Sequence, residues 1–133
     1  MSNHIVESYI QNPTYNKKID DPNITQVEWN PLCGDKITIY LKIQDDTIQA
    51  YSYSGELSRI SKGAATFLGD IIVGEKIQDI LSRDLNTIES HDFVVSTRRK
   101  RAAVIALLAC KNAIHKYIND WIQEHFDDIL YNT

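Results

Sequence analysis

The residues Lys36-Ile37-Thr38-Ile39-Tyr40-Leu41-Lys42-Ile43 alternate strictly between polar and apolar side chains. This period of two is typical of a β-strand with one buried face. Gln44-Asp45-Asp46 supplies a tight turn after it, and residues 47–54 are expected to return as a second strand. On the other side of the alternating run, residues 25–29 are expected to form a third strand. The sequence therefore predicts a three-stranded antiparallel meander.

The segments that flank the meander are predicted to be helical. A short helix near the N-terminus ends at about Pro13, and a helix over residues 60–71 can end at Gly74. A second short helix is expected over residues 75–83. Residues 97–130 contain no glycine or proline, and we expect a long helix there with a break near Asn119-Asp120. Its apolar stripe repeats at three- and four-residue steps and consists of Ala103, Leu107, Cys110, Ile114, Tyr117 and Trp121.

These elements predict an α+β fold, with one small three-stranded antiparallel sheet covered by helices, in a single domain of residues 1–133. The chain carries 14 Lys+Arg against 18 Asp+Glu, a formal net charge of −4, which disfavours non-specific binding to nucleic acid. No apolar stretch approaches the roughly 18 residues of a spanning helix. The N-terminus shows no basic region followed by an apolar run. We therefore expect a cytoplasmic protein whose partners include neither a membrane nor a nucleic acid.

The loop Asn30-Pro31-Leu32-Cys33-Gly34-Asp35 carries the most chemistry. It places a thiol in a tight turn between two strands, with the Asp35 carboxylate two residues away. A thiol beside a carboxylate can bind a metal ion or accept sulfur. The alternative is a buried small residue followed by a turn-forming aspartate. The second cysteine of the chain, Cys110, is expected to be a packed core thiol, and two cysteines cannot form a disulfide scaffold.

The pattern Asn-Pro-x-Cys-Gly-Asp before an alternating strand resembles the NifU/IscU/SufU family of iron–sulfur cluster scaffolds. Tyr9 and Asn12-Pro13 resemble that family's opening helix and turn. The run Tyr53-Ser54-Gly55-Glu56-Leu57-Ser58 stands where the family has Phe-x-Gly-x-Gly-Cys. The distance along the chain from Ser58 to Arg101 is the one between the family's second and third cysteines. The match covers roughly residues 5–118 and implies the family's fold.

The chain departs from the family at the metal site. The family holds a cluster or zinc with three cysteines and the loop aspartate. Here Cys33 and Asp35 are kept as the candidate cofactor and metal ligands, whereas Ser58 and Arg101 occupy the other two cysteine positions. The resemblance is thus to a divergent member that lacks two of three ligand cysteines. It implies an iron–sulfur cluster, iron or zinc as the cofactor. It implies a cysteine desulfurase or a scaffold paralogue as the partner, and it is compatible with a homodimer of this chain.

The two substitutions change what the site can bind. A serine hydroxyl is far less acidic than a thiol, so Ser58 is a poor ligand for iron but a good N-cap for a helix beginning near Arg59. The Arg101 guanidinium has no lone pair to donate, and near the site it would repel a cation, attract an anion or pair with Asp35. The run Arg98-Arg99-Lys100-Arg101 at a helix N-terminus opposes the macrodipole, which suggests an acidic partner; a solvated face is the alternative.

No feature of the sequence supports hydrolase or transferase chemistry. Three functions are compatible with these residues. The first is iron–sulfur cluster assembly with a degenerate metal site, in which two protomers bridge a cluster through their Cys33 thiolates together with Asp35 or glutathione. The second is a non-catalytic interaction or regulatory module that binds a cysteine desulfurase or a true scaffold. The third is a single-thiol sulfur acceptor, with a persulfide on Cys33 steadied by Arg101. The four histidines show no metal-ligand spacing, and His91 is expected at the surface.

Overall fold

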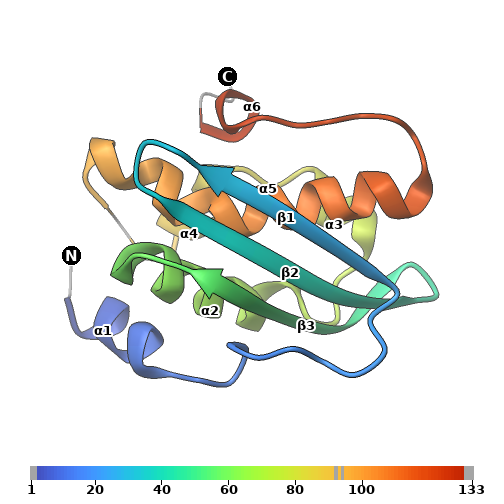
Figure 1. The fold of residues 1–133 in the computed structure, drawn as a ribbon, viewed down its shortest axis with the longest axis horizontal. Coiled ribbons are helices and arrows are strands. Elements are labelled where there is room, and N and C mark those ends of the chain that lie inside the picture. Colours follow the sequence, from blue (N-terminus) through green and yellow to red (C-terminus); the bar gives the residue numbers. More distant parts are fainter. Residues whose placement is uncertain (1–2, 92, 94, 131–133) are drawn as a thin grey trace.

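The sheet of the computed structural model, which describes residues 3–91, 93 and 95–130, is the predicted meander (Figure 1). β1 (Ile24–Asn30), β2 (Asp35–Gln44) and β3 (Thr47–Glu56) pair antiparallel in the order β1-β2-β3. The alternation along β2 is explained by burial, because its apolar side chains all lie in the core: Ile37, Ile39, Leu41 and Ile43. The predicted α+β fold with a small antiparallel sheet is confirmed.

The register of β1 with β2 fixes the position of the site loop. Asn30 lies opposite Asp35, and Glu28 lies opposite Ile37. The loop 31–34 is therefore a short connection at one end of the sheet. Because side chains alternate along a strand, Asp35 shares the buried face of β2 with Ile37.

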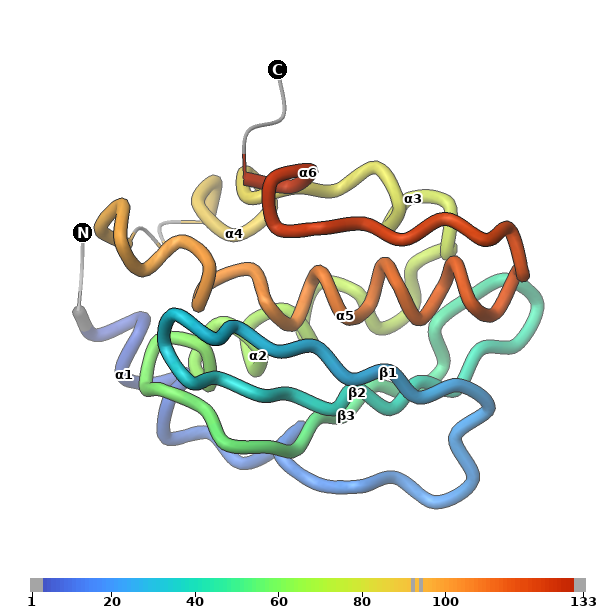
Figure 2. The backbone as a smooth tube through the Cα atoms, turned by 45° about the horizontal axis from the view of Figure 1, so that its top comes forward, coloured from blue at the N-terminus to red at the C-terminus, as the bar shows by residue number. Residues whose placement is uncertain are grey.

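Helices cover the buried face of the sheet, and Figure 2 shows the two layers edge-on. α5 packs against β1 and β2 and also against α2, while α1 packs against α2. α6 lies on α5, on the side away from the sheet (Figure 2). The bounds are α1 (Asn3–Gln11), α2 (Arg59–Ile72), α3 (Ile77–Leu81), α4 (Leu85–Glu89), the 3₁₀ turn η1 (Thr97–Arg99), α5 (Lys100–Ile118) and α6 (Phe126–Leu130).

The end of α2 follows the prediction. Gly74 has a positive φ of 93°, a conformation that glycine adopts without steric cost. Its N–H donates to the carbonyl oxygen of Ile48 at 2.8 Å. The end of the helix is thus tied to β3. No helix in the part of the chain that the structure describes is long and apolar enough to cross a membrane.

The C-terminal region departs from the prediction after Asn119. The expected break is present, because Asn119 adopts the left-handed conformation (φ 60°) and ends α5. The chain then turns back along α5 and is helical again only from Phe126. Trp121 is therefore 89% exposed, and its assignment to the apolar stripe of the long helix is wrong. Trp29 is also largely exposed, at 62%, on the face of β1 opposite α5.

α4 was not expected from the sequence. The Asp84 side chain caps it by accepting a hydrogen bond from the backbone N–H of Asn86 at 2.8 Å. A helix of five residues is too short to show a 3.6-residue period, so the apolar pattern gave no signal of it. The predicted helix over residues 75–83 is present in shorter form as α3.

Candidate functional site

The loop between β1 and β2 projects Cys33 from the end of the sheet. The Asn30 carbonyl oxygen accepts hydrogen bonds from the backbone N–H groups of Cys33 (3.2 Å) and Gly34 (2.9 Å). Gly34 has a positive φ of 76°, which closes the turn and which a residue with a side chain adopts only rarely. Leu32 is 76% exposed and Cys33 is exposed beside it. The loop thus presents a thiol to solvent rather than burying a small residue.

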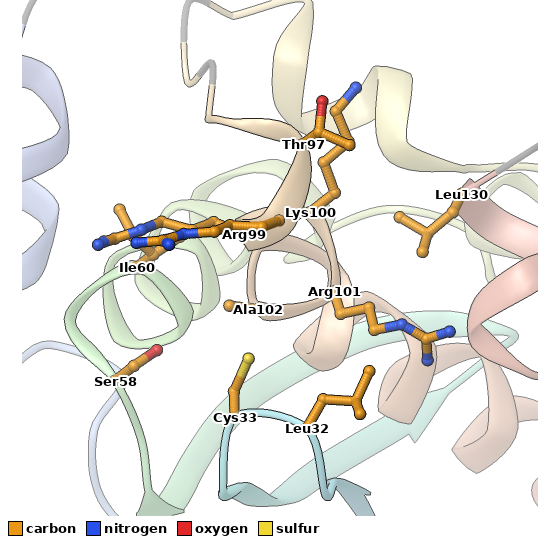
Figure 3. Close-up of a pocket in the computed structure, with 11 residues that line it drawn as sticks. Leu32, Cys33, Ser58, Ile60, Thr97, Arg99, Lys100, Arg101, Ala102 and Leu130 are labelled. Atoms are coloured by element: carbon orange, nitrogen blue, oxygen red, sulfur yellow. The ribbon is translucent and has the colours of Figure 1, made fainter.

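Cys33 faces a pocket of about 750 Å³ between this loop and the N-terminal ends of α2 and α5 (Figure 3). Three of the positions singled out in the sequence meet there: Cys33, Ser58 and Arg101. We call this cavity the thiol pocket. Its lining is Leu32, Cys33, Ser58, Ile60, Thr97, Arg98, Arg99, Lys100, Arg101, Ala102 and Leu130.

Asp35 lies outside the thiol pocket and has a structural task. Its side chain is buried and accepts hydrogen bonds from the backbone N–H of Ser58 (2.6 Å) and from the hydroxyls of Ser61 (2.9 Å) and Ser58 (3.4 Å). A carboxylate at a helix N-terminus satisfies N–H groups that have no partner within the helix. Asp35 therefore fastens the start of α2 to the start of β2.

Ser58 is the N-cap of α2, as the sequence predicts. Its backbone is extended, and its hydroxyl accepts from the backbone N–H of Ser61 at 3.4 Å. The same hydroxyl lies 3.0 Å from the Ser61 hydroxyl. The side chain at the second cysteine position of the family is thus engaged in capping.

The Arg101 side chain turns away from Cys33 toward α6 (Figure 3). Its guanidinium lies 4.9 Å from the ring centroid of Phe126 and 3.7 Å from the Asp127 carboxylate. Such a cation–π contact with an adjacent ion pair holds the guanidinium in place. The pairing with Asp35 considered from the sequence is not formed, because Asp127 is the partner of Arg101.

The donor set does not fit a resident metal or cluster. Iron–sulfur and zinc sites are built mainly from thiolates and imidazoles, and the thiol pocket offers one thiol beside two hydroxyls and four cationic side chains. Within residues 3–91, 93 and 95–130 no group of three or more His, Cys, Asp or Glu side chains could hold a metal ion. His91 is exposed and bonds the carbonyl oxygen of Thr87 (3.1 Å) outside this pocket.

A buried polar cluster that the sequence did not indicate lies on α5. The His115 ring bonds Asp120 through Nδ1 (2.8 Å) and Glu124 through Nε2 (2.7 Å). Lys111 pairs with the other Glu124 oxygen at 3.0 Å. The backbone N–H of Ile122 and then His115 lower the pKa of the Asp120 carboxyl. The cluster holds residues 120–124 against α5; its partners meet only because the chain reverses at Asn119, so no helical spacing could reveal them.

The second thiol belongs to the core, as predicted. Cys110 is fully buried on α5, and burial raises the pKa of its thiol well above the ordinary range. The thiolate is the reactive form of cysteine, so Cys110 is expected to be inert in the folded protein.

The native protein is therefore expected to take up one equivalent of iodoacetamide, at Cys33. In guanidinium chloride it should take up two, because unfolding exposes Cys110. Peptide mass spectrometry after a timed pulse of reagent locates the label. Labelling of native Cys110 at the rate of Cys33 would contradict the assignment of Cys110 to a closed core.

A family model described as NifU-like N terminal domain matches residues 1–123 of the chain. Among curated proteins, the iron–sulfur cluster assembly scaffold protein IscU of Thermotoga maritima is 29% identical over 82 residues, 62% of this chain and 58% of the relative. The zinc-dependent sulfurtransferase SufU of Bacillus subtilis is 27% identical over 78 residues, 59% of this chain and 52% of the relative. The matches thus span about half the length of these relatives.

Solved structures share the fold. The putative scaffold protein for the SUF system from Fervidobacterium islandicum superposes with a TM-score of 0.71 at 16% identity, covering 83% of this chain and 93% of that one. The N-terminal part of a NifU-like protein from Brucella abortus gives 0.70 at 12% identity, with 89% and 94% covered. At such identities the likeness shows the architecture, and it agrees with the sheet and helices described above.

Proposed function

The chain belongs to the family of NifU-like N-terminal domains, and from that membership we propose that it acts in iron–sulfur cluster assembly with a degenerate metal site. In this proposal Cys33 receives sulfur as a persulfide from a cysteine desulfurase. The chain is then a sulfur carrier rather than an enzyme in its own right. Two relatives support this assignment by name, one as an assembly scaffold and one as a sulfurtransferase.

The proposal rests on one observation: Cys33 is an exposed thiol, and the lining of its pocket has no other thiol and no imidazole. Holding a cluster or zinc takes several thiolates or imidazoles, whereas accepting a sulfur atom takes one. Cys33 is exposed and lines the thiol pocket, while Ser58 caps α2 and Arg101 is bound to α6. The zinc dependence in the name of the Bacillus subtilis relative is not carried over, because the described residues contain no group of three or more side chains that could hold the ion.

The transfer step balances without an added oxidant. The Cys33 thiolate attacks the outer sulfur of the donor's persulfide. A new S–S bond forms on Cys33, the donor's S–S bond breaks, and the donor cysteine leaves as a thiolate. The proton of the outer sulfur stays with it or is exchanged with solvent.

Incubation with a cysteine desulfurase and free cysteine tests the proposal. Mass spectrometry should show an added mass of about 32 Da, one sulfur atom, on the peptide that contains Cys33. The Cys110→Ser variant should retain this adduct and the Cys33→Ser variant should lose it. Absence of the adduct on a protein that binds the desulfurase would overturn the proposal. A second experiment is anaerobic incubation with iron and sulfide. If the protein becomes coloured and retains iron, and if both effects require Cys33, the result would instead support a cluster bridged between two protomers.

A second candidate is an interaction module without sulfur transfer. It is favoured by the exposed apolar side chains of Leu32, within the same loop, and of Trp29, near the end of β1 before it. Exposed apolar side chains of this size can form the core of a protein interface. Under this alternative the Cys33→Ser variant binds a desulfurase or a scaffold as well as the natural chain does, and Leu32→Asp abolishes binding. Equal binding by Leu32→Asp would remove this candidate.

A further inference from the structure

The lining of the thiol pocket carries four cations and no carboxylate. Lys100 and Arg101 have acidic partners outside the lining, Glu89 at 3.7 Å and Asp127 at 3.7 Å. Arg98 and Arg99 are exposed and pair with no acidic side chain among the residues that the structure describes. This concentration of positive charge runs against the net charge of −4 of the chain, so it is a local property of the pocket.

We infer that the thiol pocket is an anion-binding site that selects sulfur groups flanked by carboxylates for reaction at Cys33. The inference deepens the proposed function, on which it rests for sulfur as the group transferred. The carboxylates can come from an acidic segment of a protein donor or from a small anionic thiol or disulfide. Both sources present the same chemistry to the pocket.

The arrangement of charge around the thiol supports this selection. Figure 3 shows Cys33 at the base of the pocket, with Arg99 reaching over Ile60 on one side and Arg101 turned to the opposite side. The apolar side chains Leu32, Ile60 and Ala102 also line the pocket. A ligand whose sulfur meets Cys33 therefore has apolar surface around the sulfur and guanidinium groups around its periphery. Guanidinium groups bind carboxylates through paired, charge-assisted hydrogen bonds.

The same lining explains why a cation is a poor ligand here. A metal ion in the thiol pocket is repelled by the positive charge of the lining, chiefly by Arg98 and Arg99, since Lys100 and Arg101 are paired with Glu89 and Asp127. Clefts lined by one sign of charge raise the local concentration of the opposite ion and its association rate by about 10-fold or more at low salt. The position that binds metal in the family's pattern thus favours the opposite charge in this chain.

The test compares three small aliphatic disulfides of similar size: the dianion dithiodipropionate, the neutral hydroxyethyl disulfide and the dication cystamine. In each reaction the Cys33 thiolate attacks one disulfide sulfur, a mixed disulfide forms, and the other half leaves as a thiolate. The rates on the native Cys110→Ser variant are divided by the rates of a small neutral thiol with the same reagents. We expect the normalised ratio of dianion to dication to be about 10-fold or more at low salt. It should approach unity at about 1 M salt, where the screening length is about 3 Å.

Two charge-matched double variants complete the design. Arg98→Gln with Arg99→Gln removes two cations of the lining and should remove most of the charge selectivity. Lys17→Gln with Lys18→Gln removes two exposed cations outside the lining and should leave it intact. A normalised ratio near unity in the natural lining, or equal ratios in the two double variants, would overturn the inference.

A final comparison tests whether the carboxylates come from a protein donor or from a small molecule. One probe is a cysteine peptide disulfide flanked by aspartate and glutamate, with its asparagine and glutamine counterpart as control, and the other is oxidised glutathione. Faster reaction of the acidic peptide supports a protein donor, and faster reaction of oxidised glutathione supports a small one. If the acidic peptide does not react faster than its neutral counterpart, and oxidised glutathione does not react faster than hydroxyethyl disulfide, the inference fails. Charge selectivity without the desulfurase-dependent adduct would refute the proposed function alone, and the adduct without charge selectivity would refute this inference alone.

Discussion

Replacing Asp35 by alanine is expected to lower the free energy of unfolding by about 3 kcal/mol. The substitution removes the acceptor of three hydrogen bonds: one from the backbone N–H of Ser58 and two from the hydroxyls of Ser58 and Ser61. The site is buried, so water cannot replace the lost acceptor without rearrangement. Denaturant unfolding followed by circular dichroism measures the change, with an unaltered slope if the mechanism is local.

Asp35→Asn is the matched control. The amide keeps one oxygen that can accept the Ser58 N–H but loses the charge, so about half of the loss is expected. Sulfur uptake at Cys33 should survive in both variants under conditions where they are folded, because Asp35 does not line the thiol pocket. An Asp35→Ala protein of natural stability that no longer forms the Cys33 adduct would show that the carboxylate acts in the chemistry rather than in the fold.

Replacing Glu124 by alanine is expected to destabilise the protein by about 3–5 kcal/mol, the range for removal of one partner of a buried ion pair. Lys111 is only 4% exposed and would be left as a cation without its carboxylate, and His115 would lose its partner at Nε2. The Asn112 side chain would still hold the backbone of residue 124, since its amide bonds the N–H (2.8 Å) and the carbonyl (3.0 Å) there. The loss of stability should therefore come from the unpaired charge and not from a displaced backbone at residue 124.

Gln123→Ala, at the neighbouring exposed position, is the control and should change stability by less than about 0.5 kcal/mol. A double variant with Lys111→Met and Glu124→Leu tests the origin of the loss. If the cost is that of a stranded cation, the double variant should recover a large part of it. Equal instability of the single and double variants would show that shape, and not charge, explains the effect.

The sequence predicted the sheet because one face of β2 is buried throughout, which makes the period of two visible in Ile37 to Ile43. The same period of two predicts that Asp35 is buried, although the loop motif drew attention to it as a ligand. Asp35 is in phase with Ile37, and a residue in phase with the buried face points into the core. The loop motif made it a candidate ligand beside Cys33, whereas in the structure its carboxylate accepts hydrogen bonds from Ser58 and Ser61 and does not line the thiol pocket.

The remaining differences arise where the chain reverses. The bonds from His115 to Asp120 and Glu124 depend on a left-handed residue at Asn119, and the direction of Arg101 depends on where α6 then returns. These contacts follow from a turn geometry and not from a repeated pattern. The helical period therefore located the break but could not predict what lies beyond it.

The exposure of both tryptophans has an optical consequence. Trp29 and Trp121 are the two tryptophans of the chain, and both indole rings already stand largely in water in the folded state. Their emission should resemble that of the unfolded chain, so it is a poor monitor of folding. Trp29 lies on β1, two residues before the first residue of the loop that carries Cys33. A blue shift of the emission on mixing with another protein would thus report that a partner has covered the end of the sheet beside the thiol.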